Sequence, residues 1–179
     1  MHLGTGFNYC KQNWREKRRK RCKVYLTKLG RKLGFDVFPH AARKSHEYMV
    51  DLCWISQRTK RWNLELAVEM EWDARPYEVQ YDFTKLVNLK SPKKIMLCAP
   101  WPGHRLNTLD NITRIVRESK YSSEEEQYAI IFFVYAKDDR ELVRKGIEAR
   151  GFLINYKGEV TCELIADRDE KKIARAGRG

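Results

Sequence analysis

The sequence predicts one α/β domain with a central mixed sheet flanked by helices, because segments of two hydrophobic periodicities alternate along the chain. Short apolar runs typical of strands are separated by longer segments whose apolar residues recur at helical spacing. The expected order is α-β-β-β-α-β-α-β-α with an appended hairpin. At 179 residues and 42% hydrophobic content, the chain can fill one globular core. We assign the domain to residues 14–166, after a flexible segment 1–13 and before a frayed tail 167–179.

The N-terminal part is expected to hold one helix and three strands. Apolar residues recur at helical spacing up to Leu33, and Gly34 follows where a C-terminal cap belongs, which predicts a basic amphipathic helix from Trp14 to Leu33. Three short segments rich in β-branched, aromatic and large apolar residues come next, and the RTKR linker predicts a hairpin between the last two. These strands are expected at residues 35–41, 48–56 and 61–72.

Helices and strands then alternate. Pro92 marks the end of a helix that begins near Glu78, and Gly151 closes a helix running from Asp138 or Asp139 to Arg150. Another helix is expected between these two, and the strand in YAIIFFVYA is the most hydrophobic and therefore central. The remaining elements are a helix at residues 107–120, strands at 93–100 and 128–136, and a hairpin of 152–156 with 160–165.

Charge favours an anionic partner. The formal net charge is +12, which suits phosphate polymers or anionic membrane surfaces. Nearly all of the excess lies in residues 1–50, which carry 13 basic and 3 acidic side chains. The run KRRKRCK at positions 17–23 could be a solvated helix face or a phosphate-binding surface. The candidate nucleic-acid-binding residues are Arg18, Arg19, Lys20, Arg21 and Lys23.

Cysteine usage and hydropathy predict a cytoplasmic protein with no membrane partner. The five cysteines are widely spaced and form no C-x-x-C pair, so neither a disulfide framework nor a zinc knuckle is indicated. No segment approaches the roughly 20 apolar residues that span a bilayer, and the N-terminus lacks the apolar core of a signal peptide.

One acidic residue interrupts an apolar strand. In YMVDLCWI both faces of the expected strand are apolar, and Asp51 stands alone between Met49 and Cys53 on one of them. A carboxylate buried there costs several kcal/mol unless a cation or hydrogen-bond donors compensate its charge. A buried salt bridge and a metal site explain Asp51 equally well.

The following strand carries a row of carboxylates. Glu65, Glu69 and Glu71 share one face with Ala67, while large apolar residues occupy the other. Like charges on one strand face repel each other, which argues against a merely solvated face. If the two strands pair, Asp51 meets Glu69 and Glu71, and a pocket with only oxygen ligands suits Mg²⁺ or Mn²⁺.

The order of these residues, Asp51 on one strand and the run AVEME with Glu69 and Glu71 on the next, resembles the PD-(D/E)xK nuclease superfamily in its E-x-E variant. The resemblance covers residues 14–136 and implies a restriction-endonuclease-like core. It also implies that Asp51 and Glu69 hold metal ions together with the main-chain carbonyl of Met70. Glu71 takes the position of the usual lysine as base or water-positioning group.

The chain departs from the family pattern at two positions. Val50 stands where proline is common, and Glu71 stands where lysine is usual. Lys85 on the following helix is an alternative source of the lysine, as in some relatives, although pairing with Asp82 three residues earlier is the slightly favoured explanation. Glu47 resembles the additional upstream acid of many members.

Three functions remain open. The first is a Mg²⁺-dependent (or Mn²⁺-dependent) endonuclease that hydrolyses phosphodiester bonds, with DNA favoured over RNA through the resemblance alone. The second is a nucleic-acid-binding protein that keeps the fold without cleaving, and the third is an RNA-directed nuclease. A homodimer is expected by analogy with relatives that cut both strands.

Overall fold

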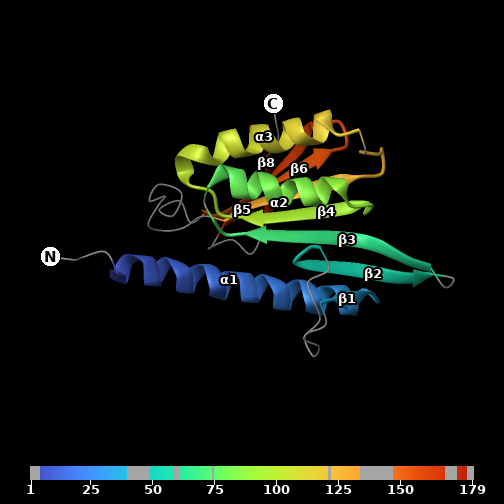
Figure 1. Cartoon of the computed structure of the whole chain (residues 1–179), viewed down its shortest axis with the longest axis horizontal. Helices are drawn as coiled ribbons and strands as arrows, with labels where there is room; N and C mark the ends of the chain where they lie inside the picture. Colours follow the sequence, from blue (N-terminus) through green and yellow to red (C-terminus); the bar gives the residue numbers. More distant parts are fainter. Residues whose placement is uncertain are drawn as a thin grey trace.

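The computed structural model describes residues 5–39, 49–58, 61–73, 75–120, 122–133, 147–167 and 173–176. These residues form three layers, with an eight-stranded sheet in the middle (Figure 1). The long helix α1 (Thr5–Lys32) lies against one face of the sheet, and α2 (Pro76–Asn88) and α3 (Arg105–Glu118) cover the other. The predicted α/β class with a mixed sheet flanked by helices is therefore confirmed.

The strands lie side by side in the order in which they occur along the chain. β1 to β3 form an antiparallel meander, whereas β4 and β5 run parallel to β3 because α2 and then the segment containing α3 return the chain to the starting edge. β6, β7 and β8 extend the sheet with antiparallel pairs. Their bounds are Asp36–Phe38 (β1), Leu52–Arg58 (β2), Arg61–Glu71 (β3), Lys93–Cys98 (β4), Gln127–Phe133 (β5), Ile147–Asn155 (β6), Val160–Asp167 (β7) and Ile173–Ala176 (β8), with a 3₁₀ turn, η1, at Pro102–His104.

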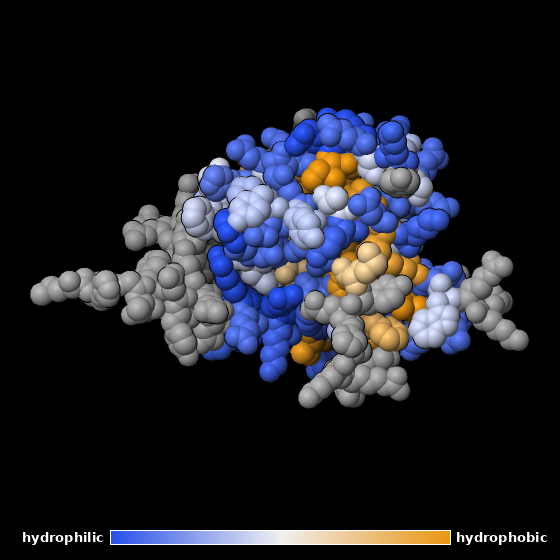
Figure 2. All heavy atoms as spheres, in the orientation of Figure 1, coloured by the Kyte–Doolittle hydropathy of each residue, from blue (hydrophilic) through white to orange (hydrophobic). Residues whose placement is uncertain are grey.

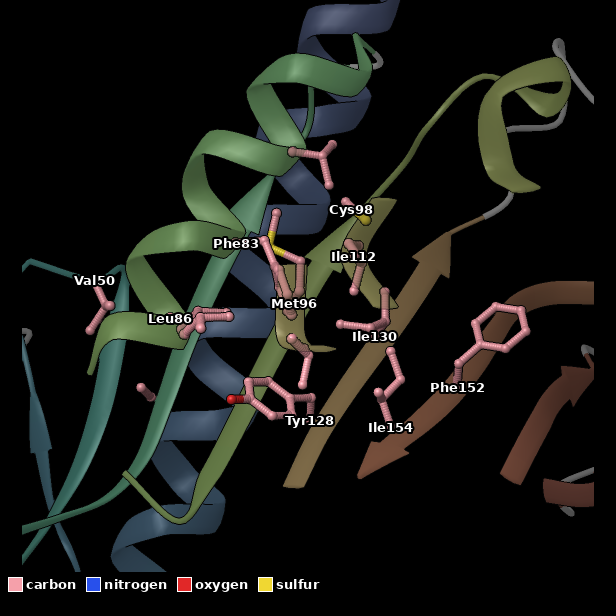
Figure 3. Packing of buried hydrophobic residues seen from close by; sticks show 14 of the residues in the cluster. Val50, Phe83, Leu86, Met96, Cys98, Ile112, Tyr128, Ile130, Phe152 and Ile154 are labelled. Carbon is pink, nitrogen blue, oxygen red and sulfur yellow. The ribbon is translucent and has the colours of Figure 1, made fainter. Parts of the chain in front are cut away.

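Each face of the sheet has its own hydrophobic core. Phe83 and Leu86 of α2 pack with Met96 of β4 and Ile112 of α3 in the larger core (Figure 3). On the opposite face, apolar residues of β2, β3 and β4 pack against the inner stripe of α1, which comprises Cys22, Leu26 and Leu29. From Leu66 onward, the alternation along β3 thus places large apolar residues toward α1 and acidic residues toward α2. Leu64, on the other side of a register shift between β2 and β3, packs in the core on the α2 side.

Three boundaries differ from the prediction. α1 begins at Thr5 rather than Trp14, so most of segment 1–13 is helical. The stretch Ile147–Arg150, expected to end a helix, belongs to β6, because its backbone pairs with both β5 and β7 and tertiary pairing outweighs local propensity. Residues 138–146 of that expected helix lie outside the described part of the chain. The tail expected to fray contributes β8, which pairs with β7.

Candidate active site

Asp51 lies at the entrance of β2. The strand begins one residue later, at Leu52, and Met49 adopts a left-handed backbone conformation with φ 42°. Val50 belongs to the same core cluster as Cys53, whereas Leu52 belongs to the cluster on the α1 face, so the regular alternation expected along this segment is broken at Asp51. Asp51 is nevertheless buried, with 5% of its surface exposed, as the apolar surroundings predicted.

The cations that compensate Asp51 come from α1. Arg19 donates a hydrogen bond to Oδ1 of Asp51, and Nζ of Lys23 lies 2.9 Å from the same oxygen. The main-chain N–H of Met70 donates to Oδ2 at 2.9 Å. Burial alone would raise the pKa of Asp51, but the hydrogen bonds and charges of Lys23 and Arg19 lower it below its ordinary value. Asp51 therefore carries a negative charge at neutral pH and is held by ion pairs with two partly exposed cations.

Glu69 shares the ammonium group of Lys85 with Asp82. It is buried in the C-terminal half of β3, and Nζ of Lys85 on α2 lies 3.0 Å from its Oε1. The same Nζ lies 2.6 Å from Oδ1 of Asp82. Burial raises the pKa of Glu69 to about 7; Lys85 opposes that rise, and the charges of Asp51 and Asp82 add to it. The desolvation of Glu69 thus outweighs the effect of Lys85 on its pKa.

Glu71, two residues further along β3, turns toward a different part of the site. Its Oε1 accepts a hydrogen bond from the main-chain N–H of Asp73, just beyond the strand. Burial raises the pKa of Glu71; the bond from Asp73 lowers it, and a hydrogen bond and charge from Asp82 raise it again. Asp82 therefore lies between the two glutamates and interacts with both.

Asp82 is the residue of this site that sequence reasoning did not assign to it. The sequence indicates it only as a surface partner for Lys85, three positions later on the same helix. The feature of the sequence that could have identified Asp82 is its position on the helix that directly follows the acidic strand. α2 packs on the face of the sheet that carries Glu69, so polar side chains of this helix lie next to the carboxylates.

The predicted phosphate-binding run divides between several roles. Arg19 and Lys23 point to Asp51, while the guanidinium of Arg18 lies 5.0 Å from the ring centre of Phe133. Lys20 and Arg21 are exposed. The run is therefore neither a uniform solvated face nor a uniform phosphate-binding surface. Glu47, predicted as an additional metal ligand, lies outside the described residues.

The arrangement of the carboxylates bears on whether they can hold a divalent cation. Within the described ranges, no group of three His, Cys, Asp or Glu side chains is arranged as a complete metal-ligand set. Asp51 and Glu69 nonetheless bring two buried carboxylates close enough for the charge of one to raise the pKa of the other. Mg²⁺ is commonly held by one or two carboxylates and keeps several waters, so the pair fits such an ion if Arg19 and Lys23 move off Asp51.

Comparison with known proteins identifies no family. No family model matches the chain, and no curated protein sequence matches it. A carbon-nitrogen hydrolase from Helicobacter pylori G27 is among the solved structures similar to it, with 16% sequence identity and a TM-score of 0.31. The alignment covers 62% of this chain and spans 39% of the hydrolase. In the described part of the chain, no helix has both the length and the apolar character needed to cross a bilayer.

Proposed function

We propose that this chain is a metal-dependent nuclease with a restriction-endonuclease-like core, acting on phosphodiester bonds of nucleic acid. The observation that carries the proposal is a pair of buried carboxylates, Asp51 at the entrance of β2 and Glu69 on the neighbouring strand β3, with Lys85 in contact with Glu69. A buried pair of acids next to a lysine is costly to maintain as a purely structural feature. It is a common arrangement where a hard cation and a water molecule are used in hydrolysis.

In this proposal each side chain has a distinct role. Asp51 and Glu69 bind a divalent cation, assisted by the main-chain carbonyl of Met70. Mg²⁺ or Mn²⁺, when bound, supplies positive charge for the phosphate oxygens and makes a water molecule more acidic. Lys85, whose ammonium group contacts Glu69, orients the attacking water. Glu71 is the second candidate for that role.

Arg19 and Lys23 are proposed to exchange partners when substrate binds. In the structure they neutralise Asp51. Once a cation takes over that neutralisation, the two basic side chains bind the backbone phosphates of the substrate in place of Asp51. The basic helix and the acidic pair then act in one site, which accounts for an ion pair between a predicted phosphate-binding surface and a predicted metal ligand.

The decisive experiment is cleavage of plasmid DNA, single-stranded DNA and RNA with Mg²⁺ or Mn²⁺, with a chelator as a blank. We expect Asp51→Asn and Glu69→Gln to reduce cleavage by about two orders of magnitude or more, a loss typical of essential polar groups in hydrolytic sites. Glu65→Gln is the matched control, because Glu65 is a glutamate of the same strand whose Oε1 accepts a hydrogen bond from Ser56. It should retain activity.

The same assay separates the two candidates for the water-positioning group. Lys85→Gln should lose most of the activity, whereas Glu71→Gln should keep more of it, because Lys85 contacts Glu69 while Glu71 turns to Asp73. The opposite ranking would assign the role to Glu71. If no nucleic acid is cut under any metal by folded wild-type protein, the nuclease proposal is wrong.

One observation favours the alternative of a non-cleaving nucleic-acid-binding protein. The ion pairs from Arg19 and Lys23 already compensate Asp51 without a metal, and no lysine follows Glu69 at the position usual for the family. Such a protein would bind nucleic acid with equal affinity in chelator and in Mg²⁺. RNA as the substrate is tested by the same panel.

A further inference from the structure

Two tyrosines stand exposed on α2. Tyr77 has 55% of its surface exposed and Tyr81 has 69%. They are four residues apart, so they lie one above the other on the same face of the helix. In Figure 2, pale atoms of intermediate hydropathy lie over α2 among blue hydrophilic ones. Large aromatic side chains in neighbouring exposed positions are a common feature of surfaces that bind flat ligands.

Each tyrosine has a basic partner. The guanidinium of Arg75 lies 4.9 Å from the ring centre of Tyr77, and Nζ of Lys85 lies 5.7 Å from that of Tyr81. Nζ of Lys85 also lies 3.0 Å from Oε1 of Glu69. Lys85 therefore connects the exposed aromatic face of α2 to one of the two buried carboxylates. The tyrosines therefore adjoin the candidate active site and are not an isolated surface patch.

The polarity of the α2 face that carries Tyr77 and Tyr81 distinguishes between possible binding partners. The face continues along α2 with Thr84 and Asn88, which are exposed and polar. An apolar partner helix would find no aliphatic residues in these positions. Nucleobases stack on aromatic rings and accept polar, hydrated surroundings, and a chain with a net charge of +12 attracts their phosphates.

We propose that Tyr77 and Tyr81 form a stacking platform for unpaired bases, so that the substrate of this site is single-stranded nucleic acid or a duplex with a single-stranded segment. The inference rests on the proposed function, because it takes the acidic pair to be the place of cleavage. The C-terminal end of β3 lies between α1 and α2 (Figure 1), so one strand can contact cations of α1 with its backbone and tyrosines of α2 with its bases.

The test is binding of fluorescently labelled oligothymidine to the full chain in chelator, measured by anisotropy. An abasic oligonucleotide of equal length keeps the phosphates and removes the bases, and a duplex of the same length hides them. We expect wild type to bind oligothymidine more tightly than either. Removing a stacking ring should weaken oligothymidine binding by about tenfold for each tyrosine.

The variants are Tyr77→Ala, Tyr81→Ala, and the corresponding phenylalanine substitutions, which keep the ring. The alanine variants should lose affinity for oligothymidine but not for the abasic strand, and the phenylalanine variants should retain it. Trp62→Ala is the matched control, because Trp62 is an equally exposed aromatic residue near the opposite end of β3. It should leave both affinities unchanged.

The results distinguish this inference from the proposed function. If Mg²⁺-dependent cleavage occurs but the tyrosine variants bind all three ligands like wild type, the stacking platform is wrong and the nuclease stands. If nothing is cleaved but oligothymidine binding still depends on the rings, the platform stands without catalysis. A change of oligomeric state in the double alanine variant, measured by sedimentation, would instead assign the face to a second copy and overturn the inference.

Discussion

At the scale of single residues, the two central carboxylates have opposite pKa shifts for the same degree of burial. Asp51 receives two cations and a main-chain N–H, which together lower its pKa despite desolvation. Glu69 shares one lysine with Asp82, so desolvation prevails and its pKa rises to about 7. Desolvation sets the direction of such shifts unless enough opposite charge is supplied.

Glu69 should therefore make stability fall as pH rises. Its folded pKa of about 7 lies above the ordinary 4.5, so the folded state binds this proton more tightly than the unfolded state does. The stabilisation is complete below the ordinary pKa and is lost as pH rises through about 7. In metal-free buffer, Glu69→Gln removes this dependence.

The measurement is urea unfolding of wild type and Glu69→Gln in chelator at several pH values. The stability of wild type relative to the variant should fall by roughly 2–3 kcal/mol between about pH 5 and pH 8. A difference that stays constant over this range would mean that Glu69 is ionised at an ordinary pKa, with Lys85 fully compensating its burial.

At the scale of elements, the packing of α1 against the sheet brings two basic side chains to Asp51. A Cβ added to Gly30 would lie 2.6 Å from Nε1 of Trp54 and 2.8 Å from Cγ2 of Val37. The glycine thus lets the end of α1 approach the sheet closely, and this approach helps to hold Arg19 and Lys23 in register with Asp51.

Gly30→Ala should destabilise the protein although alanine is the better helix former. The propensity gain is at most about 1 kcal/mol, whereas overpacking a close contact costs about 1–3 kcal/mol. We expect a lower midpoint in thermal unfolding. Gly103→Ala is the control, because a Cβ there meets no atom within 4 Å. A midpoint for Gly30→Ala at or above that of wild type would contradict the close packing of α1.

At the scale of the whole molecule, the net charge of +12 should appear in the salt dependence of binding. Each phosphate neutralised by a basic side chain contributes about 0.7–0.9 to the slope of log K against log salt. Lys20 and Arg21 are exposed on α1, next to the residues that contact Asp51. If α1 binds phosphates, these two should contribute together with Arg19 and Lys23.

Replacing both Lys20 and Arg21 with glutamine should reduce that slope by about 1.4–1.8 for every nucleic acid, irrespective of sequence. The control is the pair Lys120→Gln and Lys157→Gln, which removes the same charge at two exposed positions just beyond α3 and β6. Equal slopes for the two double variants would mean that binding responds to net charge and not to α1.

Periodicity in the sequence was sufficient for most of the architecture. The alternation in β3, the helical stripe of α2 and the apolar run of β5 each report burial of a local segment, and the structure has these elements where they were predicted. The expected helix ending at Arg150 was wrong because a stretch of mixed propensity is decided by its neighbours, here β5 and β7.

By itself, the sequence determined the α/β class, the burial of Asp51 and the acidic face of β3. Only the tertiary structure decided which charges meet: Arg19 reaches Asp51 across 32 residues, and Asp82 joins Glu69 through Lys85. The physical reason is that burial follows from local hydrophobic pattern, whereas the partner of a buried charge depends on how distant elements pack. The local sequence pattern indicates that Asp51 needs a compensating cation, but it does not identify the residue that supplies it.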